Sequence, residues 1–177
     1  MKKLQSTWYN MAIVLTAIAV VAGTALGYVN QITAPTIKAI NDQKEKDAEL
    51  EVLNGQEGTA IKITDPKGFG GALTVMVGLS PDGTILGYKV LESSETPGLG
   101  AKAQDWFQKG HKGDIIGKQA GELTVSKDGG EVDAITASTI TSRAFLRCIN
   151  AAYKALSESY ADGKSGASSQ SGKNNNI

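Results

Sequence analysis

A short apolar run enters a cluster of hydroxyl residues at Asp133-Ala134-Ile135-Thr136-Ala137-Ser138-Thr139-Ile140-Thr141-Ser142-Arg143. Apolar residues then recur at helical spacing on one stripe: Phe145, Cys148, Ile149, Ala152 and Leu156. Ser138 and Thr139 therefore lie where a helix N-cap belongs, beside backbone N–H groups that have no partner within the helix. Those N–H groups and the helix dipole also favour negative charge. A hydroxyl here could cap the helix or present itself to a phosphate, and composition alone favours capping.

The same residues carry a resemblance. Asp133-x-x-Thr136-Ala137-Ser138-Thr139 resembles the flavinylation motif Asp-x-x-(Ser/Thr)-Gly-Ala-(Ser/Thr) of the FMN-binding domain family. In that family the last hydroxyl residue is joined to FMN through a phosphodiester, so the resemblance implies Thr139 as the attachment residue. Ala137 stands where glycine is usual, and Ser138 where alanine is usual. Both are small enough for a phosphate to approach closely, and Ser138 is a second candidate hydroxyl.

A second block resembles the same family at Glu95-Thr96-Pro97-Gly98-Leu99-Gly100, followed by Trp106. The proline and the glycines predict a loop whose backbone can approach a flat ligand, although an ordinary turn would have the same composition. The resemblance implies that FMN lies along this loop and the start of the last helix. The cofactor-binding residues that it implies are Glu95, Thr96, Gly98, Leu99, Lys102, Asp133, Thr136, Ala137, Ser138 and Thr139.

Length and composition limit the possible functions. The 177 residues suffice for one domain with a sizeable core plus an appendage. Acidic and basic residues balance at 18 each, so no nucleic-acid partner is expected. Cys148 is the single cysteine, and its place on the apolar stripe predicts a buried thiol. His111, in a turn without a second ligand nearby, predicts a solvated side chain and no metal site.

The first thirty residues have the pattern of a membrane anchor. Residues 11–29 carry no charge and would span roughly 28 Å as a helix, close to the hydrocarbon thickness of a bilayer. Lys2 and Lys3 predict a cytoplasmic N-terminus over residues 1–10, with the chain after residue 29 outside the cytoplasmic membrane. A cleaved signal peptide is an alternative, because small residues at 22–25 could allow cleavage. A buried core helix does not fit a segment that has no polar face.

The rest of the chain predicts alternating helices and hairpins. A charged stalk helix is expected over residues 30–57, with Pro35 at its first helical position. Strands at 72–77 and 84–90 form a hairpin across the turn 80–83. The glycine-rich stretch 67–71 is interpreted as a flexible entry to the first of these strands. A short helix covers 101–108.

A second hairpin is expected to pair residues 122–126 with 131–135, and the last helix to end near Tyr160. Residues 163–177 are polar and small, which predicts a disordered tail. The fold class is therefore α+β: one transmembrane helix followed by an extracytoplasmic domain over 58–162. The family resemblance implies a curved sheet flanked by helices.

The resemblance extends to the G subunits of Rnf-type complexes, which couple electron transfer between ferredoxin and NAD to ion translocation. It implies a membrane-embedded electron-transfer subunit with covalent FMN, other membrane subunits as partners, and a flavin transferase that uses FAD and magnesium for maturation. No catalytic acid–base pair is visible, so the flavin would carry the redox chemistry. One alternative is the C subunit of a sodium-pumping NADH:quinone reductase, which is typically longer. Another is a flavin-free, membrane-tethered binding module in which Thr139 is only a helix cap.

Overall fold

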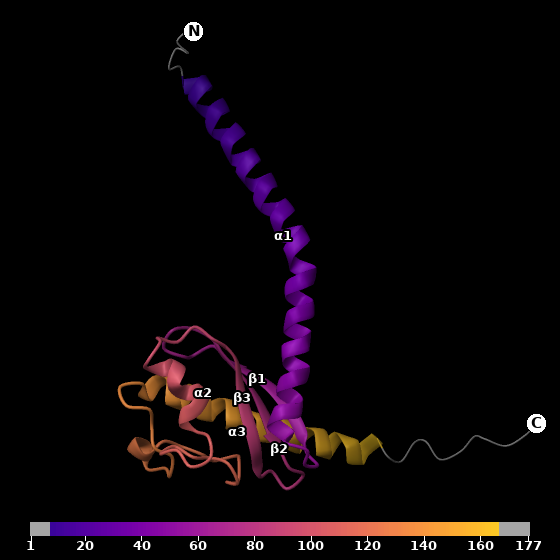
Figure 1. Ribbon diagram of the computed structural model, residues 1–177, viewed down its shortest axis with the longest axis vertical. Helices are drawn as coiled ribbons and strands as arrows, with labels where there is room; N and C mark the ends of the chain where they lie inside the picture. The colour runs from indigo at the N-terminus through magenta and orange to yellow at the C-terminus, as the bar shows by residue number, and fades with distance from the viewer. Residues whose placement is uncertain (1–7, 167–177) are drawn as a thin grey trace, which may run out of the picture. The chain divides into compact units, whose positions relative to one another are not determined.

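The computed structural model describes the backbone of residues 8–166 and the side chains of residues 8–161 (Figure 1). The chain divides into two compact units, residues 1–43 and residues 44–177. The first unit is helical where it is described, and the second contains the three-stranded sheet and every other helix.

The long N-terminal helix α1 runs from Trp8 to Leu53 without interruption. It is the one helix in the described range that is long and apolar enough to cross a membrane, with a mean hydropathy of 2.2 over its most apolar window. The hydroxyls of Thr16 and Thr24 donate to carbonyls four residues earlier, at 2.8 and 2.5 Å, so their polar groups are satisfied within the helix.

The prediction that Pro35 opens a separate helix is wrong. Pro35 lies inside α1. The residues just before it include no glycine or other breaker, so the apolar helix continues through the proline rather than ending ahead of it. The membrane-like segment and the charged segment that follows it are therefore one helix in the structure.

The sheet contains β1 (Thr59–Asp65), β2 (Leu73–Leu79) and β3 (Ile85–Ser93), in that order and all antiparallel. The predicted hairpin is confirmed as β2 and β3. The strand β1 was not anticipated. Register shifts between β2 and β3 at Thr74/Val75 and Gly78/Leu79 introduce bulges, which bend a sheet. The predicted α+β class is confirmed.

The central strand β2 is buried along its whole length rather than on alternate residues. Val75 and Val77 pack in the main core with helix α3, while Met76 packs on the opposite face with Ala48 and Val52 of α1. Gly78 lies so close to α1 that a Cβ there would approach the Val52 carbonyl oxygen to 2.5 Å. A strand covered on both faces loses the alternation that a half-exposed strand would show.

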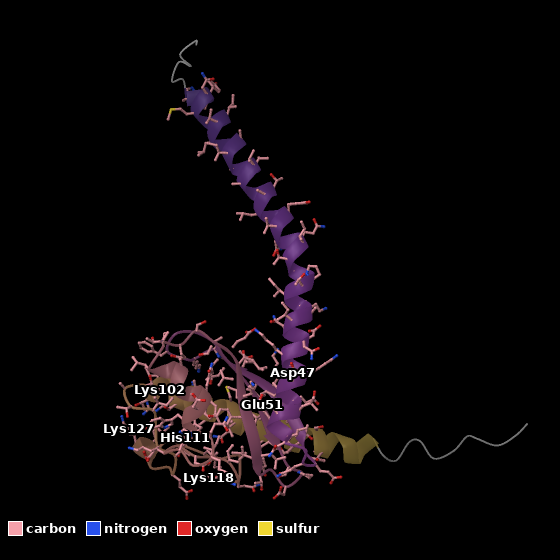
Figure 2. All side chains as sticks on the ribbon, viewed as in Figure 1. Asp47, Glu51, Lys102, His111, Lys118 and Lys127 are labelled. Carbon is pink, nitrogen blue, oxygen red and sulfur yellow. The ribbon has the colours of Figure 1, made fainter. Side chains whose placement is uncertain are left out.

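Between the sheet and the last helix the chain forms short elements. The predicted helix at 101–108 is present as η1 (Gly100–Lys102) followed by α2 (Ala103–Trp106). The Tyr88 hydroxyl donates to the Ala103 carbonyl at 2.9 Å and so ties α2 to β3. His111 is exposed in its turn, as predicted (Figure 2).

The predicted second hairpin is wrong. Residues 122–135 contain one isolated bridge, between Val125 and Val132, and the 3-10 turn η2 (Ser126–Asp128). The backbone N–H of Asp128 bonds to the Val125 carbonyl at 2.8 Å, which takes this segment out of the extended conformation. Val125, Val132 and Ile135 are each buried in the core, so their apolar character reflects separate anchor points rather than two paired strands.

The last helix, α3, runs from Thr139 to Gly166 and packs on the sheet. Phe145 stacks on Phe107 with ring centroids 4.3 Å apart and meets Tyr88 edge-on at 4.7 Å. Cys148 is buried as predicted, and its burial raises the pKa of the thiol to about 12. The helix continues past Tyr160 into the predicted tail, and residues 167–177 of that tail lie outside the described residues.

Candidate functional site

A cavity of about 340 Å³ lies between the loop 95–100 and the start of α3. Its size is in the range of small-molecule sites. Three of its lining side chains are large, apolar and exposed: Phe69 is 70% exposed, Leu99 41% and Ile140 48%. Apolar side chains gathered around one cavity favour a ligand with a flat apolar part. The full lining comprises Phe69, Glu95, Thr96, Leu99, Gly100, Ala137, Ser138, Thr139 and Ile140.

Glu95 joins two parts of the cavity wall. Its side chain is only 7% exposed, and Oε1 accepts a hydrogen bond from the backbone N–H of Phe69 at 2.8 Å. A Cβ built on Gly100 would lie 2.4 Å from Glu95 Oε2 and 2.8 Å from Thr141 Oγ1. Gly100 therefore has to be glycine for the Glu95 side chain to occupy its place.

The loop itself is held by its own backbone. The N–H groups of Leu99 and Ala101 both bond to the Thr96 carbonyl, at 3.1 and 3.3 Å. Gly98 has a φ of +77°, and a Cβ there would meet no atom within 4 Å. The positive φ explains why this residue is glycine, because no neighbouring atom lies close enough to exclude a side chain.

A tight turn precedes α3. The Ser138 N–H bonds to the Ile135 carbonyl at 3.0 Å, and Ala137 has a φ of +61°. This left-handed conformation accounts for the glycine that is usual at position 137 in the resembled motif. The Ser142 hydroxyl accepts from the Ile135 N–H and donates to the Ser138 carbonyl, both at 2.9 Å.

The Ser138 hydroxyl does not cap the helix as the sequence suggested. The Ser138 carbonyl accepts the Ser142 N–H at 3.0 Å, as an N-cap carbonyl should, but its hydroxyl bonds to no N–H of the first turn within the described residues. The Ser142 hydroxyl bonds the turn to the helix through the Ile135 N–H and the Ser138 carbonyl, and it caps no N–H of the first turn. Ser138 is 9% exposed, whereas Thr139 beside it is half-buried.

The Thr139 hydroxyl accepts a hydrogen bond from a cationic side chain. Lys127 Nζ, on η2, donates to Thr139 Oγ1 at 3.1 Å. Figure 2 labels Lys127 at the end of the domain where α3 begins. The next residue, Asp128, accepts two hydrogen bonds from Arg143 of α3, at 2.7 and 2.6 Å. The hydrogen bond from Arg143 lowers the pKa of the Asp128 carboxyl, so this pair is ionised at neutral pH.

One buried hydroxyl lacks a partner. Thr141 is fully buried, and its Oγ1 has no hydrogen-bond partner among the described residues. It lies beside Gly100 and Glu95, both of which line the cavity. Buried polar groups are almost always satisfied. Thr141 does not line the cavity, so its hydroxyl is packed behind the cavity wall and not exposed to it.

The structure brings together six of the ten predicted site residues at this cavity: Glu95, Thr96, Leu99, Ala137, Ser138 and Thr139. The other four, Gly98, Lys102, Asp133 and Thr136, do not line it. The Asp133 backbone carbonyl accepts a hydrogen bond from Trp106 Nε1 at 2.8 Å, so this residue joins α2 to the segment before α3. The binding roles of all ten residues stay predictions.

Phe69, Gly100 and Ile140 were not among the predicted site residues. Phe69 stands between glycines in the stretch 67–71, where an apolar ring has no neighbours in sequence to cover it. Ile140 lies off the apolar stripe of α3. For Phe69 and Ile140 the signal was a large apolar residue in a place where it could not reach the core. Gly100 is the last residue of the predicted loop 95–100.

The chain is similar to the G subunit of the Na⁺-translocating ferredoxin:NAD⁺ oxidoreductase complex of Acetobacterium woodii. The two are 32% identical over 84% of this chain and 93% of that protein. Residues 68–154 match the model of a family described as FMN-binding domain. The chain belongs to the FMN-binding domain family. All nine residues that line the cavity fall inside the matched range, so the cavity belongs to the FMN-binding domain.

Other relatives share the domain but differ in length. The chain is 36% identical to the G subunit of the ion-translocating oxidoreductase complex of Vibrio atlanticus over 63% of this chain and 56% of that protein. It is 41% identical to the corresponding protein of the same name from Salmonella typhi over 52% of this chain and 47% of that protein. The chain therefore spans about half the length of these two relatives and nearly all of the Acetobacterium protein.

The residues at the cavity suit FMN. The exposed apolar side chains match the ring system, and the start of α3 with Lys127 matches a phosphate.

Proposed function

We propose that this chain is the membrane-anchored, electron-transferring G subunit of an Rnf-type complex, with FMN joined to Thr139 by a phosphodiester. The observation that carries the proposal is the place of the Thr139 hydroxyl, at the N-terminus of α3, on the wall of the cavity and in contact with Lys127. Bound FMN would supply the redox chemistry, and the protein would hold it and tune its potential. Other membrane proteins of the complex are the expected partners.

Access favours Thr139 over the neighbouring hydroxyls. A transferase must reach the hydroxyl from outside, and Ser138 is 9% exposed while Thr139 is half-buried. Thr136 is exposed but does not line the cavity. The helix dipole adds about 0.3–1 kcal/mol for a charge at the N-terminus, which is too little to choose between adjacent residues. Recognition of residues 133–139 by the transferase would make the choice.

FAD would be the donor of FMN in the attachment reaction. Thr139 Oγ1 forms a bond to the phosphorus on the FMN side of the pyrophosphate, and the bond from that phosphorus to the bridging oxygen breaks. AMP leaves with the bridging oxygen, and the hydroxyl proton passes to a base of the transferase. Magnesium bound by the transferase would neutralise the pyrophosphate.

Within the cavity, the chain's own residues would position the cofactor. Phe69, Leu99 and Ile140 would contact the faces and edge of the ring and exclude water from it. Glu95 would keep the two loops in place through its bond to Phe69. The backbone N–H groups of the first turn of α3 would face the phosphate.

The proposed topology follows the charge pattern of the N-terminus. Lys2 and Lys3 would stay in the cytoplasm, residues 11–29 of α1 would cross the cytoplasmic membrane, and residues 30–57 would form the stalk. The FMN-binding domain, residues 58–162, would then lie outside. A reporter enzyme that works only outside the cytoplasm, fused after Tyr160, should be active. A mature protein that starts near Gly23 or Leu26 would instead show a cleaved signal.

Two measurements test the function. The chain co-expressed with a flavin transferase should give a band that stays fluorescent on a denaturing gel, and a flavin-free binding module would give none. The chain purified from its native membranes should bring with it partner proteins that reduce NAD with ferredoxin. Recovery of NADH:quinone reductase activity instead would assign it to the sodium-pumping complex.

A further inference from the structure

We propose that Lys127 is the counter-ion of the phosphoryl group on Thr139, and that the Asp128–Arg143 pair positions it. This rests on the proposed attachment at Thr139. It assigns a role to a residue outside both motif blocks.

Two neighbouring contacts join η2 to the first turns of α3. Lys127 Nζ reaches Thr139 Oγ1 at 3.1 Å, and Asp128 binds Arg143 at 2.7 and 2.6 Å. Thr139 and Arg143 are four residues apart and therefore lie on one face of the helix. The bidentate pair fixes η2 beside this face and so holds Lys127 over the Thr139 hydroxyl.

The present contact leaves the charge of Lys127 largely unused. The ammonium group donates to a neutral hydroxyl, so the contact gains a charge–dipole attraction but no attraction between opposite charges. A phosphodiester on the same oxygen would place a negative charge and two further acceptor oxygens within reach, and would add that attraction. The ammonium would then change partner from Oγ1 to a phosphoryl oxygen without any movement of the backbone.

A further observation supports an anion at this position. The start of α3 supplies N–H groups without intrahelical partners, and the helix dipole favours negative charge there.

The acidic groups nearby explain why a cation is required. Glu95 lines the cavity and Asp128 follows Lys127 directly. Arg143 neutralises Asp128, so its carboxylate does not oppose the phosphate. Glu95 is still an acidic neighbour of the bound cofactor, and Lys127 is the cation in contact with the attachment hydroxyl.

The test measures the rate of FMN incorporation into the full-length chain by transferase, FAD and magnesium, followed by intact mass. Lys127→Met should slow incorporation roughly tenfold at low salt, while Lys127→Arg should stay within about threefold of the wild type. Asp128→Asn should fall between them. Lys112→Met, which removes an exposed lysine from the turn at 110–113, is the matched control and should incorporate FMN at the wild-type rate.

Ionic strength separates a charge effect from a structural one. Near 1 M salt the Debye length falls to about 3 Å, so the difference between wild type and Lys127→Met should shrink toward none. A melting curve for each variant checks that it is folded. In the loaded protein, the phosphorus NMR signal should shift in Lys127→Met but not in Lys112→Met.

Failure of FMN attachment and failure of the Lys127 role would give different results. A wild-type chain that takes up no FMN overturns the attachment itself. A wild-type chain that is flavinylated at the same rate as Lys127→Met, with an unchanged phosphorus signal, overturns only the role of Lys127. Lys127→Arg as slow as Lys127→Met would likewise contradict a role for the charge.

Discussion

Glu95 Oε1 accepts a hydrogen bond from the backbone N–H of Phe69 at 2.8 Å and so joins two loops of the FMN-binding domain. Two further contacts hold the segment that leads to Phe69. Arg147 of α3 donates to Asp65 at 2.6 Å and to the Lys67 carbonyl at 3.3 Å. The cavity wall is thus fixed by side chains from β1, the loop 95–100 and α3 together.

Gly100 should be the least replaceable residue of its loop. In Gly100→Ala the new Cβ would collide with Glu95 Oε2 and Thr141 Oγ1, so Glu95 would have to leave Phe69. We expect covalent FMN to fall at least about tenfold, in line with the loss of a buried hydrogen bond to a charged group. The measurement is flavin fluorescence per chain on a denaturing gel.

The control for that variant is Gly110→Ala, in a turn that does not line the cavity. Its Cβ would meet open space, and only the positive φ is strained, at about 1–2 kcal/mol. The chain should melt at a lower temperature but keep most of its flavin. Equal flavin loss in both variants would contradict the assigned role of Gly100.

Ala137 is strained in the turn before α3. With φ at +61°, Ala137→Gly should relieve about 1–2 kcal/mol of left-handed strain and lose about 0.4–1 kcal/mol to chain entropy, for a net stabilisation near 0.5–1 kcal/mol. Ala151→Gly, at an exposed position inside α3, should destabilise by about 1 kcal/mol. The melting temperature should rise in Ala137→Gly and fall in Ala151→Gly. A fall in both variants would contradict backbone strain at Ala137.

The ionisation of Asp65 should make the free energy of unfolding depend on pH in the acid range. Burial raises the pKa of its carboxyl, but the hydrogen bonds from Arg147 and the Lys67 N–H outweigh burial and hold the pKa below the ordinary 3.8. The folded state therefore binds fewer protons than the unfolded state. The stability this provides is complete above about pH 5 and is lost as pH falls through the folded pKa.

Asp65→Asn should lower the free energy of unfolding by about 1 kcal/mol at pH 7. The effect is small because the Arg147 side chain is 45% exposed, so water screens its charge. The gap to the wild type should narrow as pH falls from about 5 and vanish below the folded pKa of Asp65. Denaturant unfolding of the full-length chain in detergent at several pH values measures it, with Asp105→Asn at an exposed position of α2 as control. A gap that stays constant with pH would be inconsistent with the ion pair.

Much of the site could be predicted because its motif residues are contiguous. Glu95, Thr96 and Leu99 lie in one block, Ala137, Ser138 and Thr139 in another, and local chemistry placed both on a loop and a helix start. Phe69 was missed because its exposure depends on a loop that tertiary contacts hold in place. Lys127 was missed because a turn was expected to be the tip of a hairpin.

The fold was predicted where local pattern and tertiary packing agree, as in the β2–β3 hairpin and α3. It was not predicted where packing overrides pattern. Val125 and Val132 look like strand residues but are buried one at a time beside η2. Pro35 looks like a helix start, yet the apolar helix before it has no reason to end.

Thr139 is the proposed attachment residue for the flavin. The most direct measurement is the intact mass and peptide map of the chain after co-expression with a flavin transferase, for the wild type and for Thr139→Ala and Thr139→Ser. The wild type should gain the mass of FMN less one water, on the peptide that contains Thr139. Thr139→Ala should stay folded and gain nothing, while Thr139→Ser keeps a nucleophilic hydroxyl and should be loaded. Full loading of Thr139→Ala, with FMN mapped to Ser138, would move the attachment to Ser138.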